Sequence, residues 1–129
     1  MNEYYNSSDA LANYYIKVLF STPENRLKEA ETFYSVHFSK WAAAHEKHLQ
    51  ANGNNGHYVG ESITLSDMRT TQVMHLLKLM LPSGMEFPVL PAGLAKLIES
   101  VETEPKIAVW LQSDEYSKLS MGTKAFFKF

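Results

Sequence analysis

Hydrophobic residues recur every three or four positions along most of the chain, and this spacing is typical of amphipathic α-helices. A first such pattern begins at Ser8 or Asp9, ends at Phe20, and has Ser7 or Ser8 as its predicted N-cap. A longer pattern covers residues 24–50. Its apolar positions are predicted to form one buried stripe of Leu27, Ala30, Tyr34, Phe38, Trp41, Ala42, His45 and Leu49. No stretch of useful length alternates polar and apolar residues as a strand would, so the pattern predicts an all-α fold.

Further helices are predicted in the second half of the chain, between segments rich in Gly, Pro and Asn. They are expected at residues 65–81, 91–103 and 105–111, with a final turn at 114–118 and loops at 51–56 and 85–89. The tail from residue 120 to residue 129 includes Phe126, Phe127 and Phe129, which we expect to pack against the rest. We therefore expect a bundle of five to six helices in a single domain, residues 1–129, with an ordered core of about residues 8–119.

The most specific local signal lies at the start of the predicted helix 65–81. Thr64 and Asp67 have the spacing of a capping box, in which each side chain accepts a hydrogen bond from the other residue's backbone N–H. Ile63 and Met68 occupy the two positions of a hydrophobic staple around this cap. Residues 73–81 are almost wholly apolar, which a surface helix would not tolerate. These features predict a buried, N-capped central helix around which the bundle forms.

Composition excludes several classes of function. The net charge is −2, and Lys and Arg are scattered along the chain, which argues against a nucleic-acid partner. The absence of cysteine excludes disulfides, a thiolate nucleophile and thiolate metal sites. No apolar run approaches the ~20 residues of a membrane span, and residues 1–8 do not resemble a secretory signal. We therefore expect a cytoplasmic protein with no membrane partner.

The titratable residues show no catalytic or metal-binding pattern. His45 and His48 stand three residues apart on a predicted helix, but the sequence places no third ligand, so a structural role is expected and no metal site. His75 lies in the predicted central helix and is expected to be a hydrogen-bonded core residue. Asp67 would be the first choice for carboxylate catalysis, yet its place in the capping box already accounts for it.

Two blocks of sequence resemble cytosolic glutathione transferases. The first block, similar to the segment that leads into the sixth helix of those enzymes, is Val59-Gly60-Glu61-x-Ile63-Thr64-Leu65-Ser66-Asp67. The second, similar to their late helices where a Pro-Lys pair opens a helix, is Val101-x-x-x-Pro105-Lys106-Ile107-x-x-Trp110-Leu111-x-Ser113-x-x-Tyr116. Ser66 stands where the family usually has Ala. The resemblance extends from about Ser8 to Leu119 and is closest to the mu, pi and sigma types.

The resemblance implies the all-helical C-terminal domain of such an enzyme without its thioredoxin-like N-terminal domain, since no βαβ pattern precedes Ser8. In this family the catalytic residue and nearly all glutathione contacts belong to the thioredoxin-like domain. The resemblance therefore implies that this chain has no catalytic residue and binds no cofactor by itself. Glutathione would be the cosubstrate of the complete enzyme.

The resemblance also implies binding roles for residues of the first helix. Ile16 and Phe20 match positions that contact the small hydrophobic electrophile, although they could instead pack beneath the aromatic residues of the tail. In mu and pi types, an Asp of this helix reaches glutathione bound to the neighbouring subunit. Asp9 lies one position from that site, which is occupied by Ala10.

Two functions of different classes follow from the resemblance. The chain would be the helical half of a glutathione transferase, contributing the electrophile pocket and dimer contacts beside a thioredoxin-like companion domain. Alternatively it would be a freestanding, non-catalytic interaction module of the kind found in translation-elongation subunits and tRNA-synthetase complexes. An unrelated helical bundle would require both blocks to be accidental. A wide exposed apolar face favours the first function, because a domain that stands alone should not leave one.

Overall fold

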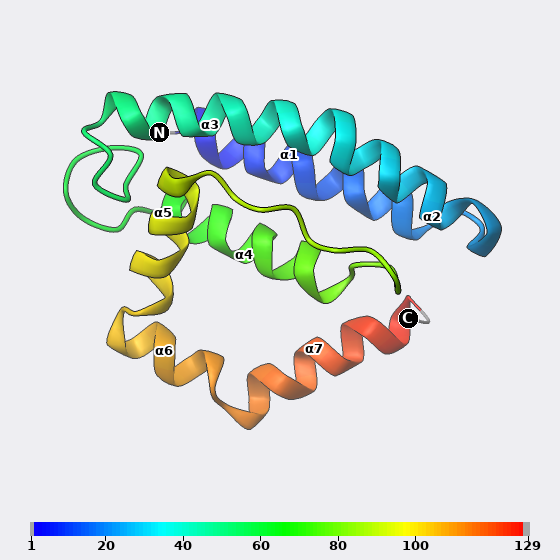
Figure 1. Cartoon of the computed structure of the whole chain (residues 1–129). Coiled ribbons are helices and arrows are strands. Elements are labelled where there is room, and N and C mark those ends of the chain that lie inside the picture. Colours follow the sequence, from blue (N-terminus) through cyan, green and yellow to red (C-terminus); the bar gives the residue numbers. More distant parts are fainter. Residues whose placement is uncertain (1, 128–129) are drawn as a thin grey trace.

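Helices form all of the regular secondary structure in residues 2–127, the part of the chain that this computed structural model describes (Figure 1). The segments are α1 (Asn2–Leu19), α2 (Pro23–Thr32), the π-helical η1 (Phe33–Phe38), α3 (Ser39–Ala51), α4 (Leu65–Leu79), α5 (Ala92–Glu102), α6 (Pro105–Leu111) and α7 (Asp114–Phe126). Because α2, η1 and α3 follow one another without a break, they form one continuous long helix. The described residues therefore contain six continuous helices. The predicted all-α fold is confirmed.

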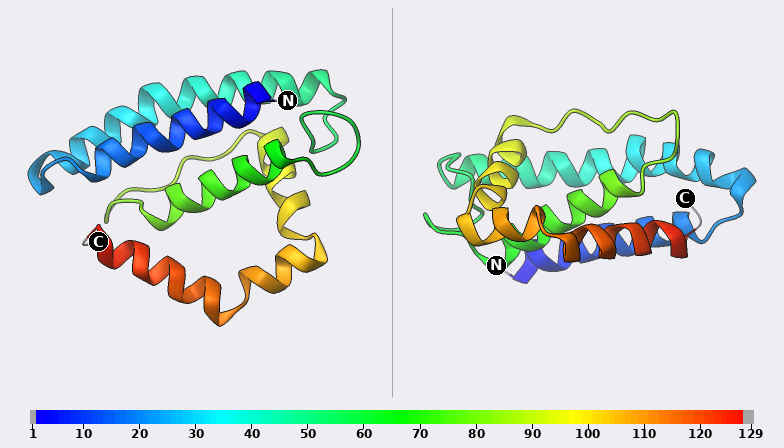
Figure 2. Two further views of the ribbon diagram at one scale, coloured as in Figure 1. Left: turned by 180° about the vertical axis from the view of Figure 1, so that it is seen from behind. Right: turned by 90° about the horizontal axis from the view of Figure 1, so that it is seen from below.

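Helix α4 is the central element of the bundle. It packs along α1, and the rod of α2, η1 and α3 covers the other side of α1 (Figure 1). Helix α5 crosses one end of the bundle and packs on both α3 and α4. Helices α6 and α7 then return on the far side of α4, so that the end of α7 approaches the end of α1 (Figure 2).

The core is drawn from every element up to α5. Its largest fully buried side chains include Tyr15, Leu19, Phe33, Leu49, Met74, Leu77, Met80, Leu94 and Leu97. Two tyrosines join this core to the end of α4, since the Tyr15 hydroxyl donates to the Met80 carbonyl at 2.5 Å and the Tyr34 hydroxyl donates to the Leu77 carbonyl at 3.4 Å. Burial raises the pKa of Tyr15 to about 12, so the hydroxyl keeps the proton that this bond requires.

The first helix begins earlier than predicted, at Asn2 rather than at Ser8 or Asp9. Ser7 and Ser8 were predicted to cap it, and this prediction is wrong because both lie inside the helix. Their hydroxyls bond to other elements: Ser8 Oγ lies 2.8 Å from Thr70 Oγ1, and Ser7 Oγ lies 3.0 Å from His45 Nε2. Serine is common at helix starts, but here its hydroxyl serves contacts between helices.

The long helix formed by α2, η1 and α3 departs from the predicted stripe at two positions. Leu27 was predicted to be buried, but it is 46% exposed, whereas Phe33, which was left off the predicted stripe, is fully buried. A π-helical turn bonds residue i to i+5 and so holds about one residue more than an α-turn. The inserted residue shifts the buried face by roughly one position, so the predicted stripe is wrong at Leu27, although Ala30 is buried as predicted.

Helix α7 is longer than the predicted final turn at 114–118, because it continues to Phe126. Ser113 caps its start by accepting from the Tyr116 N–H at 3.1 Å. Of the tail aromatics, Phe127 packs against the core, Phe126 is 70% exposed, and Phe129 lies outside the described residues. No helix in the described part of the chain combines the length and apolarity that crossing a bilayer demands.

The start of α4 is fixed by the fully buried carboxylate of Asp67. Both hydrogen bonds of the capping box are present, with Asp67 N donating to Thr64 Oγ1 at 3.3 Å and Thr64 N donating to Asp67 Oδ2 at 3.0 Å. The same carboxylate also accepts from the Tyr58 N–H at 3.1 Å and from His57 Nδ1 at 2.9 Å. Asp67 therefore joins the loop after α3 to the helix as well as capping it. For the predicted staple, Ile63 is half-buried and Met68 is 37% exposed.

Helix α5 is capped by a side chain from a distant part of the chain. Its own N-cap residue is Pro91, which has no side-chain acceptor. The carboxylate of Glu46 in α3 accepts from the N–H groups of Gly93 and Leu94 at 2.9 and 3.0 Å. A Cβ at position 93 would lie 2.5 and 2.6 Å from the two Glu46 oxygens, so this cap requires glycine.

We predict that Asp67→Asn destabilises the chain by about 2–3 kcal/mol. An amide nitrogen cannot accept a hydrogen bond, so at least one of three buried N–H groups would lose its acceptor. Thr64→Ala removes only the hydrogen bond from Asp67 N to the Thr64 hydroxyl and should destabilise the chain by about 1 kcal/mol. Urea unfolding followed by circular dichroism measures both, and equal losses would contradict a joining role for Asp67.

We predict that the effect of Gly93→Ala changes sign with the residue at position 46. In the unaltered chain, the new methyl group would displace the Glu46 cap and destabilise the protein by about 1 kcal/mol. After Glu46→Ala removes the cap, the remaining close neighbour of the added methyl group is Asn54 Oδ1 at 3.0 Å, on an exposed side chain that can move aside. The same substitution should then stabilise the protein by up to about 1 kcal/mol, because alanine favours helix over glycine. Gly122→Ala, in open space on α7, is the control and should stabilise both backgrounds. If the effects of Gly93→Ala and Glu46→Ala on the free energy of unfolding simply added, the proposed capping of α5 by Glu46 would be contradicted.

Candidate functional site

The predicted electrophile-contacting residues lie at the end of α1. Ile16 is half-buried, and Phe20, which follows the last helical residue, is 66% exposed. The Phe20 ring packs edge-on against Phe127, with 5.1 Å between ring centroids, and against Phe126 at 6.4 Å. Phe20 therefore contacts the tail aromatics, as the alternative interpretation expected, and still presents most of its surface to the outside.

The predicted glutathione contact, Asp9, already has a partner within the chain. Its carboxylate forms an ion pair with Nε of Arg69 on α4, and its side chain is 36% exposed. The pair joins the N-terminal halves of α1 and α4. Nothing in the geometry of Asp9 points to a second ligand.

A groove of about 570 Å³ runs along the side of α4 that faces away from the core. One wall is a single face of α4, formed by Leu65, Met68, Gln72, His75, Leu76 and Leu79. The opposite wall comes from α6 and α7 and includes Ile107, Trp110, Leu111, Tyr116, Leu119 and Thr123. This size lies within the range of about 300–1,000 Å³ that is usual for small-molecule sites.

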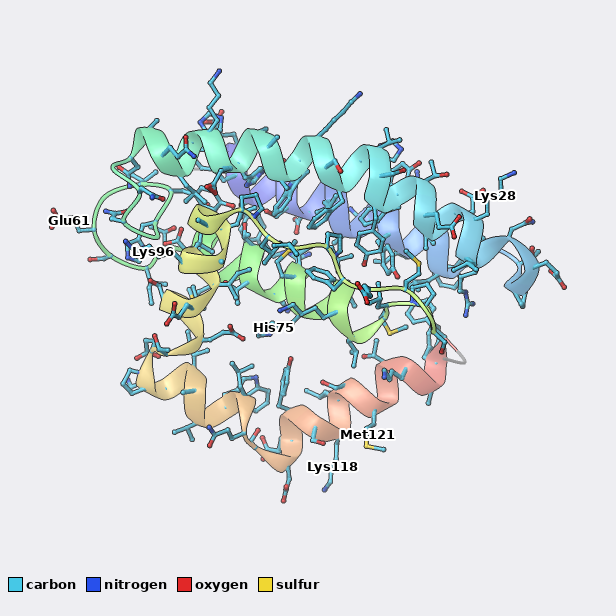
Figure 3. All side chains as sticks on the ribbon, in the orientation of Figure 1. Lys28, Glu61, His75, Lys96, Lys118 and Met121 are labelled. Carbon is cyan, nitrogen blue, oxygen red and sulfur yellow. The ribbon has the colours of Figure 1, made fainter. Side chains whose placement is uncertain are left out.

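His75 bridges the groove. Figure 3 shows it between α4 and the turn from α6 to α7, where its Nε2 lies 2.8 Å from Glu102 Oε2 and its Nδ1 lies 3.4 Å from the Tyr116 hydroxyl. His75 was predicted to be a hydrogen-bonded core residue, and it is hydrogen-bonded but only half-buried. Because both ring nitrogens have partners, the imidazole holds α7 at its distance from α4 and is not a free base.

Apolar side chains also gather on the outside of α6 and α7. Val109, Leu119, Met121 and Phe126 are each at least 63% exposed, and Figure 3 shows Met121 pointing away from the bundle. Leu119 and Phe126 are seven residues apart and share one side of α7, whereas Met121 points in a different direction. Phe20 contacts Phe126, and we call the exposed apolar surface of Leu119, Phe126 and Phe20 the α7 face. Patches of this kind are uncommon on a monomer and usually mark a surface that contacts another molecule.

A buried polar network ties α1, α3 and α4 together around His45, which is 3% exposed. Nδ1 of His45 lies 2.5 Å from the Tyr58 hydroxyl, which in turn lies 2.9 Å from Thr70 Oγ1. Burial lowers the pKa of His45 to about 4, with a further contribution from nearby His48, and burial raises the pKa of Tyr58. The imidazole is therefore neutral at physiological pH. The described residues bring no three potential metal ligands together.

Sequence reasoning missed the groove, although α4 carried a signal for it. Val73, Met74, Leu77 and Met80 form the face that packs on the core, while Leu65, Met68, Leu76 and Leu79 form a second apolar face. A helix that is apolar on two faces needs two packing surfaces. The second surface turned out to be the groove wall, but the distance to α7 could not be derived from periodicity.

We predict that acid destabilises the chain through His45. In the unfolded chain this histidine takes up a proton near pH 6.5, but in the folded chain only near pH 4, so the free energy of unfolding falls as the pH drops between these values. The loss from this residue should total about 3 kcal/mol. Urea unfolding measured from pH 7 to pH 4 should show that the free energy of unfolding declines less for His45→Gln than for the unaltered chain. Parallel pH curves for the two proteins would contradict this.

The sequence was compared with known proteins. A family model described as glutathione S-transferase, C-terminal domain, matches residues 9–114. No curated protein and no solved structure matches the chain. The family match covers more than four fifths of the 129 residues, since 106 of them lie in the matched range. It runs from the middle of α1 to the end of α6 and includes the capped start of α4. The chain therefore belongs to the glutathione S-transferase C-terminal domain family.

Proposed function

We propose that this chain is the helical half of a glutathione transferase, of the mu, pi or sigma type. In this role, the α7 face and the end of α1 form one wall of the pocket for a small hydrophobic electrophile. A thioredoxin-like companion domain, joined to this chain or separate, holds glutathione and lowers the pKa of its thiol. The homodimer contacts that the resemblance implies belong to the same proposal.

The observation that carries this proposal is the exposed apolar surface around Phe20. Burying an aromatic side chain of this size contributes roughly 1.5–3 kcal/mol, so leaving several of them exposed forgoes considerable stabilisation. A companion domain or an apolar substrate would recover it. The freestanding interaction module is less well supported, because a domain that functions alone should cover most of this surface.

The groups that the chemistry requires are supplied by the companion in this proposal. Conjugation needs a glutathione thiolate, and the electrophile must lie beside it in a site from which water is excluded. Phe20 would position the electrophile by apolar contact and would take no part in proton transfer. The chain alone is therefore expected to be inactive.

We predict that the purified chain neither binds immobilised glutathione nor conjugates 1-chloro-2,4-dinitrobenzene. A fusion that places the thioredoxin-like domain of a mu-, pi- or sigma-type enzyme ahead of residue 1 should conjugate it. In that fusion, Phe20→Ser should lower kcat/KM for the electrophile about tenfold and leave KM for glutathione unchanged, since it removes only apolar contact.

Lys17→Ser, an exposed change one turn away on α1, is the matched control and should have no effect. Turnover by the purified chain alone would overturn the inactivity of the isolated half. Equal activity of the Phe20 and Lys17 variants would show that this end of α1 does not line the electrophile pocket.

A further inference from the structure

The end of α3 and the loop after it contain the same dipeptide twice, Asn52-Gly53 and Asn55-Gly56, and the sequence has no other Asn-Gly pair. In this dipeptide the backbone nitrogen of the glycine can attack the side-chain carbonyl carbon of the asparagine. Glycine hinders the approach least, because it has no side chain and its backbone is the most adaptable. The two copies have different surroundings, and these decide which asparagine reacts.

The first copy, Asn52-Gly53, is held in an unreactive arrangement. The Gly53 N–H donates to the Gln50 carbonyl at 3.1 Å, so the attacking nitrogen would first have to give up a hydrogen bond. The Asn52 side-chain carbonyl accepts from no N–H group in the described part of the chain. Its amide nitrogen instead donates to the carbonyls of His57 and Gly60 at 2.9 and 3.0 Å. Neither the nucleophile nor the carbonyl is therefore prepared for attack.

The second copy, Asn55-Gly56, has the opposite arrangement. The Gly56 N–H has no acceptor among the described residues, so this nitrogen has no hydrogen bond to lose. The Asn55 carbonyl oxygen accepts from the His57 N–H at 3.1 Å and from the Asn52 amide at 3.4 Å. Donors on this oxygen stabilise the negative charge that develops on it as the nitrogen attacks. Asn55 is also only half-buried, which leaves it within reach of water.

Packing against α5 requires the glycine at position 56. Gly56 has a φ of +87°, a value that residues with a side chain rarely adopt. A Cβ at this position would lie 3.0 Å from Ser100 Oγ and 3.4 Å from Lys96 Cγ. The close approach of the loop to α5 therefore places a glycine directly after Asn55, and no larger residue could protect the asparagine without disturbing this contact.

We propose that Asn55 converts spontaneously to a mixture of aspartate and isoaspartate in the folded chain. The Gly56 nitrogen forms a bond to Asn55 Cγ and loses its proton, and the C–N bond of the side-chain amide breaks to release ammonia. Water then opens the resulting cyclic imide at either carbonyl carbon, which gives aspartate in one case and isoaspartate in the other. The overall reaction replaces NH2 by OH, consumes only water and changes no oxidation state.

The products disturb the contacts that hold the loop. The Asn55 amide nitrogen donates to the Gly60 carbonyl at 2.8 Å, and a carboxylate in its place would set oxygen against oxygen. Isoaspartate also adds a methylene group to the main chain shortly before His57 and Tyr58, which both donate to the buried Asp67 carboxylate. The conversion therefore loosens the loop that anchors the start of α4, and the stability of the chain falls as the protein ages.

This inference goes beyond the proposed transferase role and is independent of it. The reaction needs no glutathione, no electrophile and no companion domain, and the reacting groups all lie in one loop of the chain. A failure of either proposal would therefore leave the other unchanged.

The test is to incubate the purified chain at mildly alkaline pH and to follow each asparagine by peptide mass spectrometry. An isoaspartate-specific carboxyl methyltransferase identifies the isomer. Conversion at Asn55 should be at least about tenfold faster than at Asn52, because the Gly53 hydrogen bond and the absence of donors on the carbonyl both raise the barrier at Asn52. In urea that unfolds the chain, the two rates should become nearly equal, since the dipeptide is the same. Equal rates in the folded chain, faster conversion at Asn52, or no conversion at Asn55 would each overturn the proposal.

The effect on stability is tested with a variant that carries one of the products. Asn55→Asp should unfold at a lower urea concentration than the unaltered chain, because it loses the donor to the Gly60 carbonyl. The matched control is Asn13→Asp, which makes the same chemical change at an exposed position on α1 and should leave the midpoint unchanged. Equal midpoints for the two variants would overturn the destabilising effect of the conversion.

Discussion

The bundle depends on one fully buried carboxylate, that of Asp67, which accepts hydrogen bonds from three N–H groups. Two of these donors, Tyr58 N and His57 Nδ1, belong to the loop between α3 and α4. A buried charge that loses its partners is far more costly than a neutral group in the same place. The first turn of α4 and the loop before it are therefore fixed together, and neither can move without exposing or orphaning the charge.

This constraint extends through the loop to the other helices. The Tyr58 backbone is held by Asp67, and its hydroxyl meets both Thr70 on α4 and His45 on α3. His45 in turn meets Ser7 on α1, so three helices share one polar network beside the apolar core. Such a network specifies register, because each member has a single position at which its partners are within reach. Helix α4 is thereby fixed by its N-terminal half, and its outward face is free to form one wall of a groove.

The sequence allowed the local parts of this arrangement to be predicted and left the long-range parts open. The capping box could be recognised because Thr64 and Asp67 are three residues apart, and its other donors could not, since they lie nine or ten residues away in a loop. The helical cap from Glu46 to Gly93 spans 47 residues and leaves no local pattern. Ser7 and Ser8 gave a false start for α1 because hydroxyls at caps and between helices look alike in sequence. The groove depends on where α7 returns, which side-chain contacts of His75 and Phe127 decide.

The two surfaces that the bundle leaves open are physically linked. Leu119 belongs to the α7 face and also lines the groove, and Trp110 of α6 and Thr123 of α7 lie beside it in both places. A ligand that fills the groove would hold α7 at one distance from α4, and a partner on the α7 face would favour its own preferred distance. If these two distances differ, thermodynamic linkage requires that the groove ligand and the partner on the α7 face change each other's affinity by the same factor. The contact that joins α4 to α7 is that of His75 with the Tyr116 hydroxyl, while Glu102 of α5 holds the other ring nitrogen. Loosening the Tyr116 contact should weaken the coupling while leaving the Asp67 end of the bundle intact.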